Sequence, residues 1–164
     1  MGIDYFHYCK VITLDENYIL NLSRFLKQNN YSSTAFLRIK TNHLLIKAEI
    51  NDVEGLFILD NGASNSCVDL KKSNIFNLKY TESDEKASSA TEQISATMVS
   101  KKNKILIGKW LNKNVSIVLF DMTFINKTLS EHGDHEVCGI IGGDLLKKGK
   151  AIIDYSSNKL FLKL

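Results

Sequence analysis

The sequence predicts a mainly β domain that is preceded by one amphipathic helix and contains a second, short helix near its C-terminal end. Three observations lead to this fold class. From Ser33 onward, apolar and polar residues alternate along several segments, as in half-buried strands. Apolar residues recur at helical spacing near the start of the chain. Proline is absent, so Gly, Asn, Asp and Ser must form the turns.

Length and composition indicate one globular domain with a short appendage. The chain has 164 residues, of which 44% are hydrophobic and 24% charged, which is ordinary for a soluble protein. Its formal net charge is +3 and its basic residues are spread along the chain, whereas nucleic-acid binding needs clustered ones. No apolar run approaches the roughly 18 residues that span a bilayer. We therefore expect neither a nucleic-acid nor a membrane partner.

The three cysteines, Cys9, Cys67 and Cys138, indicate a reducing compartment. Their number is odd and none forms a CxxC pair, which argues against both a disulfide framework and a zinc site. Cys67 and Cys138 lie in apolar contexts and are expected in the core. We expect no metal or other cofactor and a cytoplasmic location, with a periplasmic or secreted one as the alternative if a leader has been removed.

The first residues predict an amphipathic helix from about Leu14 to Lys27. Thr13 and Glu16 form a capping-box pattern before it. Its apolar stripe consists of Leu14, Tyr18, Leu22, Phe25 and Leu26. We therefore divide the chain into an N-terminal helical extension, residues 1–32, and a main domain, residues 33–164.

The main domain is expected to contain short strands separated by polar turns. Residues Asn51 and Asp52 mark a turn that Gly55 ends. The apolar run Leu56–Leu59 favours a buried strand, although periodicity alone does not exclude a helix. Further strands are expected at 36–40, 44–50, 105–107, 115–120, 137–141, 151–153 and 160–162, with loops or a solvated hairpin at 81–100 and a loop at 127–136. Asp144 is expected to cap a short helix that Gly149 stops.

The sharpest chemical feature is Asp60, which directly follows the apolar run Leu56–Leu59. A carboxylate at the end of a buried strand lies at the rim of the core, and Gly62 lets backbone amides approach it closely. Burial and a second carboxylate nearby would separate the two pKa values, so that one acid can act as a base. An ordinary strand-ending turn explains Asp60-Asn61-Gly62 equally well, because Asn-Gly is itself a common turn pair.

Two longer segments resemble the signatures of retropepsin-like aspartic proteases. The segment Phe57-Ile58-Leu59-Asp60-Asn61-Gly62-Ala63-Ser64 resembles their active-site turn, usually Asp-Thr-Gly-Ala or Asp-Ser-Gly-Ala. Gly139-Ile140-Ile141-Gly142-Gly143-Asp144-Leu145-Leu146 resembles their second signature, and Ala151–Tyr155 with Lys159–Leu162 the closing strands of the bacterial branch. The resemblance covers about Thr34–Leu164 and implies a closed or partly open barrel that corresponds to half of an acid protease.

The resemblance also implies residue roles and a homodimer. Asp60 would activate water for peptide-bond cleavage, and Asn61, Gly62, Ala63 and Ser64 would form its loop. Ile140, Ile141, Gly142 and Asp144 would support that loop, with Asp144 as a helix cap and not as a second acid. Because the chain has a single such turn, the second carboxylate would come from the Asp60 of another subunit. Strand Leu160–Leu164 would interleave with the partner, and the N-terminal helix would add to the interface.

Two departures from the family pattern leave alternatives open. Asn61 stands where the family has Thr or Ser, and an Asn side chain is longer, although it still donates and accepts hydrogen bonds. The flap expected at about Glu85–Ser100, with Ser88, Ser89, Ala90 and Thr91 at its tip, contains no glycine. We therefore expect a homodimeric aspartic endopeptidase acting on peptides or partly unfolded proteins. The alternatives are a peptide-binding module that no longer cleaves and an enzyme whose activity depends on assembly.

Overall fold

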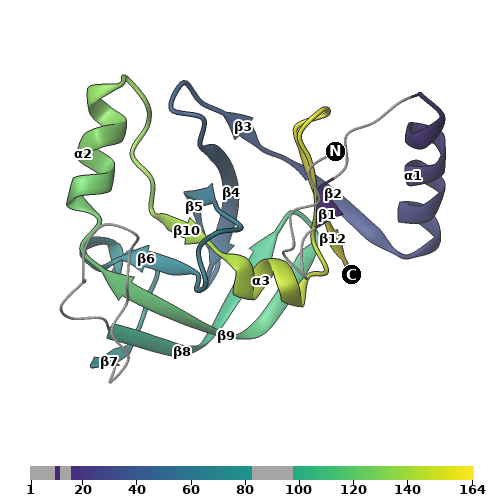
Figure 1. Cartoon of the computed structure of the whole chain (residues 1–164). Helices are drawn as coiled ribbons and strands as arrows, with labels where there is room; N and C mark the ends of the chain where they lie inside the picture. The colour runs from purple at the N-terminus through teal and green to yellow at the C-terminus, as the bar shows by residue number, and fades with distance from the viewer. Residues whose placement is uncertain (1–9, 12–15, 83–97) are drawn as a thin grey trace.

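The computed structural model describes residues 10–11, 16–82 and 98–164 of the chain. These residues form two β-sheets with helices at their margins (Figure 1). The prediction of a mainly β fold is confirmed.

The larger sheet closes on itself to form a barrel. Its strand order is β3-β4-β5-β10-β6-β9-β8-β7, and β4 also pairs with β8, so that six of the strands make a closed ring. The strands are β3 (Leu37–Arg38), β4 (Leu44–Ile50), β5 (Val53–Leu59), β6 (Cys67–Asp69), β7 (Tyr80–Glu82), β8 (Met98–Ile107), β9 (Trp110–Phe120) and β10 (Gly139–Ile141). Closure leaves the six ring strands without a free edge.

The barrel interior is filled by apolar side chains that are almost completely buried. They include Ile46, Ile50, Phe57, Phe76, Ile105, Ile107, Ile117 and Leu119. The alternation read along 44–50 and the apolar run Leu56–Leu59 therefore mark true strands, β4 and β5, and both predictions are confirmed.

The turn between β4 and β5 is Asn51–Asp52, as predicted. Both residues have positive φ, 49° and 69°, which suits a two-residue hairpin turn. The Asn51 side chain donates to the carbonyl of Phe76 (2.9 Å) and accepts from the amide of Lys104 (3.0 Å). Gly55 does not end this turn, contrary to expectation. It lies inside β5, where an added Cβ would come within 2.8 Å of the Phe76 ring.

The smaller sheet, which we call the terminal sheet, contains the two ends of the described chain. Its order is β1 (Lys10–Val11), β11 (Ile152–Asp154), β12 (Lys159–Lys163) and β2 (Tyr31–Ala35). The strands predicted at 151–153 and 160–162 are confirmed as β11 and β12, which pair in antiparallel fashion as a hairpin. Strand β12 has β11 on one side and β2 on the other. Both edges of β12 are therefore occupied by strands of the same chain. This arrangement leaves no free edge for the expected interleaving with a partner subunit.

Helix α1 (Glu16–Gln28) covers one face of the terminal sheet (Figure 1). Leu22 and Leu26 are buried there against Ile152, which confirms that the helix uses an apolar stripe. Phe25, which was assigned to the same stripe, is 46% exposed. Strand β2 begins at Tyr31, so the expected boundary after residue 32 falls inside a strand. The division into an extension and a main domain stays a prediction.

Two further helices flank the barrel. Helix α2 (Thr123–Glu131) occupies part of the segment that was expected to be a loop, so that expectation is wrong for residues 127–131. The buried side chain of Asn126 connects this helix to the segment that follows it, because it accepts a hydrogen bond from the Val137 amide (2.8 Å) and donates one to the Val137 carbonyl (3.2 Å). Helix α3 (Gly143–Lys148) ends at Gly149, as predicted. A 3-10 turn spans Leu70–Lys72.

None of the helices in the described ranges is long and apolar enough to cross a membrane.

We expect Gly139→Ala to destabilise the fold strongly. Gly139 lies in β10 between β5 and β6, and an added Cβ would sit 2.0 Å from the backbone oxygen of Cys67. Relieving that clash requires backbone movement, so we expect a loss of about 3 kcal/mol in the free energy of unfolding. Gly133→Ala is the control, because nothing lies within 4 Å of its Cβ and only its φ of +73° adds a cost, of about 1 kcal/mol. Urea unfolding measures both. Equal losses would contradict the close approach at Gly139.

The turn between β11 and β12 is built around the carboxylate of Asp154. Its Oδ1 accepts from the Ser156 amide (2.9 Å) and hydroxyl (2.6 Å), and its Oδ2 accepts from the Ser157 hydroxyl. Burial opposes ionisation of this carboxylate, but the hydrogen bonds from Ser156 and Ser157 outweigh burial and hold the pKa of Asp154 below its usual value. The charged form therefore stabilises the turn.

This lowered pKa makes part of the stability dependent on pH. The contribution is complete above the ordinary value of 3.8 and is lost as the pH falls through the lower pKa of the folded state. We expect the Ser156→Ala/Ser157→Ala variant to be less stable than wild type at pH 7 and to lose less stability on acidification. Urea unfolding between pH 2 and pH 7 tests this. A difference between the two proteins that does not shrink at low pH would contradict it.

Candidate active site

Asp60 lies at the point where β5 leaves the barrel. Strand β10 runs parallel to β5, with Ile141 opposite Leu59. The Asp60 amide donates to the Ile141 carbonyl (3.0 Å), which prolongs this pairing by one residue. The half-buried Asp60 is thereby anchored to a segment that is far from it in sequence. The two segments that resemble the family signatures, 57–64 and 139–146, are therefore neighbours in the structure.

The Asp60 carboxylate is oriented by its own turn. Its Oδ1 accepts a hydrogen bond from the amide of Gly62 (2.8 Å). A Cβ at position 62 would lie 3.2 Å from this oxygen, which is tighter than ordinary contact. Gly62 therefore lets the amide approach the carboxylate, as the sequence indicated. Asn61 and Ala63 are half-buried in the turn, and Ser64 is exposed.

A second set of hydrogen bonds fastens the far end of the turn to the start of α3. The Asp144 Oδ1 accepts from both the amide (2.8 Å) and the hydroxyl (2.6 Å) of Ser66. The Ser66 hydroxyl oxygen accepts in turn from the Gly142 amide (2.8 Å). The Gly143 amide donates to the Ala63 carbonyl (2.7 Å). We call Ser66, Asp144 and the Gly142 amide the loop brace, because they hold residues 60–66 against the β10–α3 junction.

The loop brace corrects the expected role of Asp144. The residue at the N-cap of α3 is Gly142, and no side chain caps the helix there. Asp144 lies in the first helical turn and directs its carboxylate to Ser66 instead. Its negative charge there also suits the N-terminal end of a helix. Ser66 itself was not predicted, because only the fold shows that its hydroxyl is buried against Asp144.

Gly142 and the two isoleucines before it pack beneath the turn. Ile141 is buried in the main core, and Ile140 is half-buried in the second apolar cluster with Ile58 and Cys67. A Cβ at Gly142 would come within 2.7 Å of the backbone oxygen of Asn65. The turn and the β10–α3 junction therefore fit together without space for a side chain at position 142.

The buried thiol of Cys67 is subject to the negative charges of three carboxylates. Burial is the largest cause that raises the pKa of Cys67, and the negative charges of Asp144, Asp60 and Asp69 raise it as well, whereas a backbone hydrogen bond with Ile140 lowers it. Together these effects place the pKa of Cys67 at about 12. The thiol therefore stays protonated at neutral pH, and the expectation that Cys67 is a core residue is confirmed. No group of three or more His, Cys, Asp or Glu side chains that could hold a metal occurs in the described ranges.

The expected flap tip, Ser88, Ser89, Ala90 and Thr91, lies outside the described residues. The strands on either side of residues 83–97 are described. Strand β7 pairs with β8 in antiparallel fashion, with Glu82 opposite Met98.

A scan against family models matches residues 46–145 to the model described as "Aspartyl protease". The chain belongs to this aspartyl protease family. The matched region contains the Asp60 turn, the loop brace and most of the barrel. It does not include α1, β2 or the hairpin of β11 and β12.

One solved retropepsin-like aspartic protease shares the fold of this chain, and two further solved structures are similar to it at lower scores. A retropepsin-like aspartic protease from Rickettsia conorii is 22% identical, with a TM-score of 0.53, and the match covers 81% of this chain and 90% of that one. EIAV protease complexed with the inhibitor HBY-793 is 15% identical (TM-score 0.49; 63% and 85% covered). The retroviral protease-like domain of Ddi1 from Leishmania major is 16% identical (TM-score 0.49; 73% and 87% covered). A search of curated proteins finds no match.

We expect Ser66→Ala to destabilise this aspartyl protease fold locally. The substitution leaves the Gly142 amide without its acceptor and removes one donor from the Asp144 carboxylate. Loss of a buried partner costs about 1–3 kcal/mol in the free energy of unfolding. Ser64→Ala, at an exposed position in the same turn, is the matched control and should cost less than about 0.5 kcal/mol. Urea unfolding compares them, and equal losses would contradict a role for the loop brace.

Proposed function

We propose that the protein is a homodimeric aspartic endopeptidase that hydrolyses peptide bonds between two Asp60 carboxylates, one from each subunit. The observation that carries the proposal is the Asp60 turn itself. Its carboxylate is held by the Gly62 amide at the end of a barrel strand, in a chain of the aspartyl protease family. The loop brace adds support, because a catalytic group must be held in place by its neighbours.

Two copies of Asp60 are needed because the chemistry requires an acid and a base on the same water. Two carboxylates that lie close together cannot both ionise easily, so they share one proton. The ionised member takes a proton from the attacking water, and the protonated member donates one to the carbonyl oxygen of the peptide bond. Each chain offers a single Asp-x-Gly turn of this kind. A two-fold axis then places two identical carboxylates face to face.

The other predicted residues take supporting roles in this proposal. Asn61 lies beside the reacting group, and Ala63 and Ser64 continue the turn. The flap tip at residues 88–91 would close over a bound peptide. The substrate class is peptides or partly unfolded proteins in the cytoplasm, with no cofactor.

A second candidate is a module on the same fold that binds peptides without cleaving them. The observation that favours it is Asn61, which replaces the Thr or Ser of the family signature. Its side chain is longer than the hydroxyl it replaces, so two turns that approach each other at a dimer axis would be spaced differently.

Asp60→Asn tests the proposed reaction. We expect wild-type protein to cleave members of a peptide library at mildly acidic pH and the variant to be at least about a hundredfold slower, because it lacks the acid and base. Asp52→Asn, in the exposed turn between β4 and β5, is the matched control and should keep full activity. Equal cleavage by wild type and Asp60→Asn would refute the assignment. Peptide binding without cleavage, together with cleavage gained by Asn61→Thr, would favour the binding module.

A further inference from the structure

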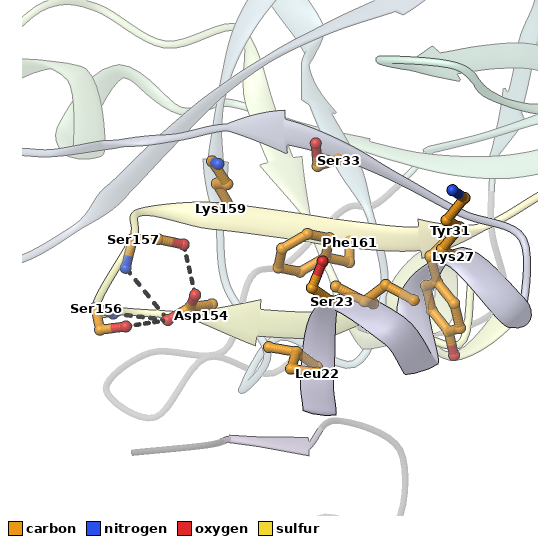
Figure 2. A pocket seen from close by; sticks show the side chains of 11 residues that line it. Leu22, Ser23, Lys27, Tyr31, Ser33, Asp154, Ser156, Ser157, Lys159 and Phe161 are labelled. Carbon is orange, nitrogen blue, oxygen red and sulfur yellow. Dashed lines mark hydrogen bonds between the residues drawn. The ribbon is translucent and has the colours of Figure 1, made fainter. Parts of the chain in front are cut away.

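A cavity of about 460 Å³ lies between helix α1 and the terminal sheet (Figure 2). Binding sites for small ligands have volumes of roughly 300–1,000 Å³. Residues that pair across antiparallel strands share a face of their sheet, so the pairing of Ser33 with Phe161 places both side chains on the face that α1 covers. Helix α1, β2 and β12 all lie outside the region 46–145 that matches the family model. None of the residues that line the cavity belongs to the Asp60 turn or to the loop brace.

The floor of this cavity is apolar. It is formed by Leu22 and Leu26 of α1 and by Phe161 of β12, which pack in one apolar cluster. The two leucines are buried, and Phe161 is half-buried. An apolar side chain that enters the cavity would remove more of this surface from water, which is favourable. The floor therefore suits one apolar group of a ligand.

Serine hydroxyls also line the cavity. Those of Ser23 and Ser33 form no hydrogen bond with any described residue. Ser156 and Ser157 donate their hydroxyl protons to Asp154, so their oxygens can still accept. A ligand that carries both N–H and C=O groups can pair with these hydroxyls in either sense. The polar part of the lining therefore suits the backbone of a peptide.

The two ends of the cavity differ in charge. At one end, Lys159 pairs with Asp154 across the two strands, so their charges offset each other. At the other end, Lys27 lies beside Tyr31 (Figure 2), and no carboxylate among the lining residues accompanies it. Lys27 also forms no ion pair with a described residue. The cavity therefore offers one cation to one anionic group, at the Tyr31 end.

We propose that this cavity binds the C-terminal end of a polypeptide whose last residue is apolar. The terminal carboxylate would pair with Lys27, and the last side chain would lie on the apolar floor. The preceding peptide groups would form hydrogen bonds with the serine hydroxyls towards the Lys159 end. The inference goes beyond the proposed function and does not rest on it, because it assigns a binding site and no reaction.

Other anionic ligands match fewer features of the lining. A fatty acid offers a carboxylate and an apolar body, but its tail would end among the hydroxyls and charges at the Lys159 end. Taking those polar groups out of water without giving them hydrogen-bond partners is unfavourable. Inorganic phosphate would leave the apolar floor uncovered. A peptide end combines the single charge, the apolar group and the amides that the cavity can accommodate.

A titration with the peptide acetyl-Gly-Ser-Gly-Ser-Leu tests the inference, because its only carboxylate is the C-terminal one. Nuclear magnetic resonance spectra of the isotope-labelled protein show both where and how tightly the peptide binds. We expect the amide signals of Ser23, Lys27 and Ser33 to shift together and to saturate. Asp60→Asn should bind in the same way, because Asp60 does not line the cavity, and its use excludes cleavage of the probe. Shifts only at the Asp60 turn would overturn the inference.

The proposed ion pair can be tested from both sides. Amidation of the peptide and Lys27→Gln each remove one of its charges, and we expect either change to weaken binding about three- to fivefold, as for an exposed ion pair. The two losses should not add, so Lys27→Gln should bind the acid and the amide equally. Arg24→Gln is the matched control, because Arg24 is exposed on the same helix but does not line the cavity. This control should keep the preference for the acid, and the same preference in Lys27→Gln would overturn the inference.

Ser33→Phe tests the cavity itself. Aromatic residues are favourable in strands, and this one would occupy the space beside Phe161. We expect the variant to bind the peptide at least about tenfold more weakly than wild type, with circular dichroism showing that it is folded. Unchanged binding by the folded variant would overturn the inference, as would wild-type protein whose signals do not shift at about 5 mM peptide. Binding of decanoate at this cavity without binding of the peptide would also overturn it.

Discussion

The parallel pairing of β10 with β5 is the constraint on which the candidate site depends. It aligns Ile141 with Leu59 and lets the Asp60 amide continue the ladder by one bond. Because β10 leads directly into α3, the same pairing delivers Asp144 and Gly142 to the other end of the Asp60 turn. The turn is therefore held at both ends by one short segment. A displacement of β10 would move the carboxylate, its Gly62 donor and the loop brace together.

Local patterns in the sequence predicted the elements that carry a clear local signal. The Asp60 turn, the run Leu56–Leu59 and the C-terminal hairpin each carry their own signal, in a turn pair or in apolar periodicity. The two signature segments also met as the family resemblance implied. The beginning of strand β2 was predicted less accurately. Tyr31 and Ser32 belong to a strand because they pair with β12, which is far away in the sequence.

The contacts that the sequence did not reveal join distant residues through polar groups. Residues 127–131 were expected to lie in a loop but continue helix α2, in which Asn126 exchanges two hydrogen bonds with Val137 beyond the helix. Ser66 and Asp144 form one unit only after β10 has paired with β5. The prediction that Phe25 belongs to the buried stripe of α1 was wrong. Helical spacing alone did not show that Phe25 lies at the margin of the face that α1 buries. Buried polar pairs and sheet edges are properties of the topology.

The pairing of β12 on both sides within its own chain affects the order in which the protein folds and associates. A subunit whose C-terminal strand finds both neighbours in its own chain does not need a partner in order to complete its terminal sheet. Folding can then precede association, and the amount of the proposed dimer would follow from mass action on folded monomers. Under that proposal, the abundance of the chain in the cell would set how much active enzyme forms.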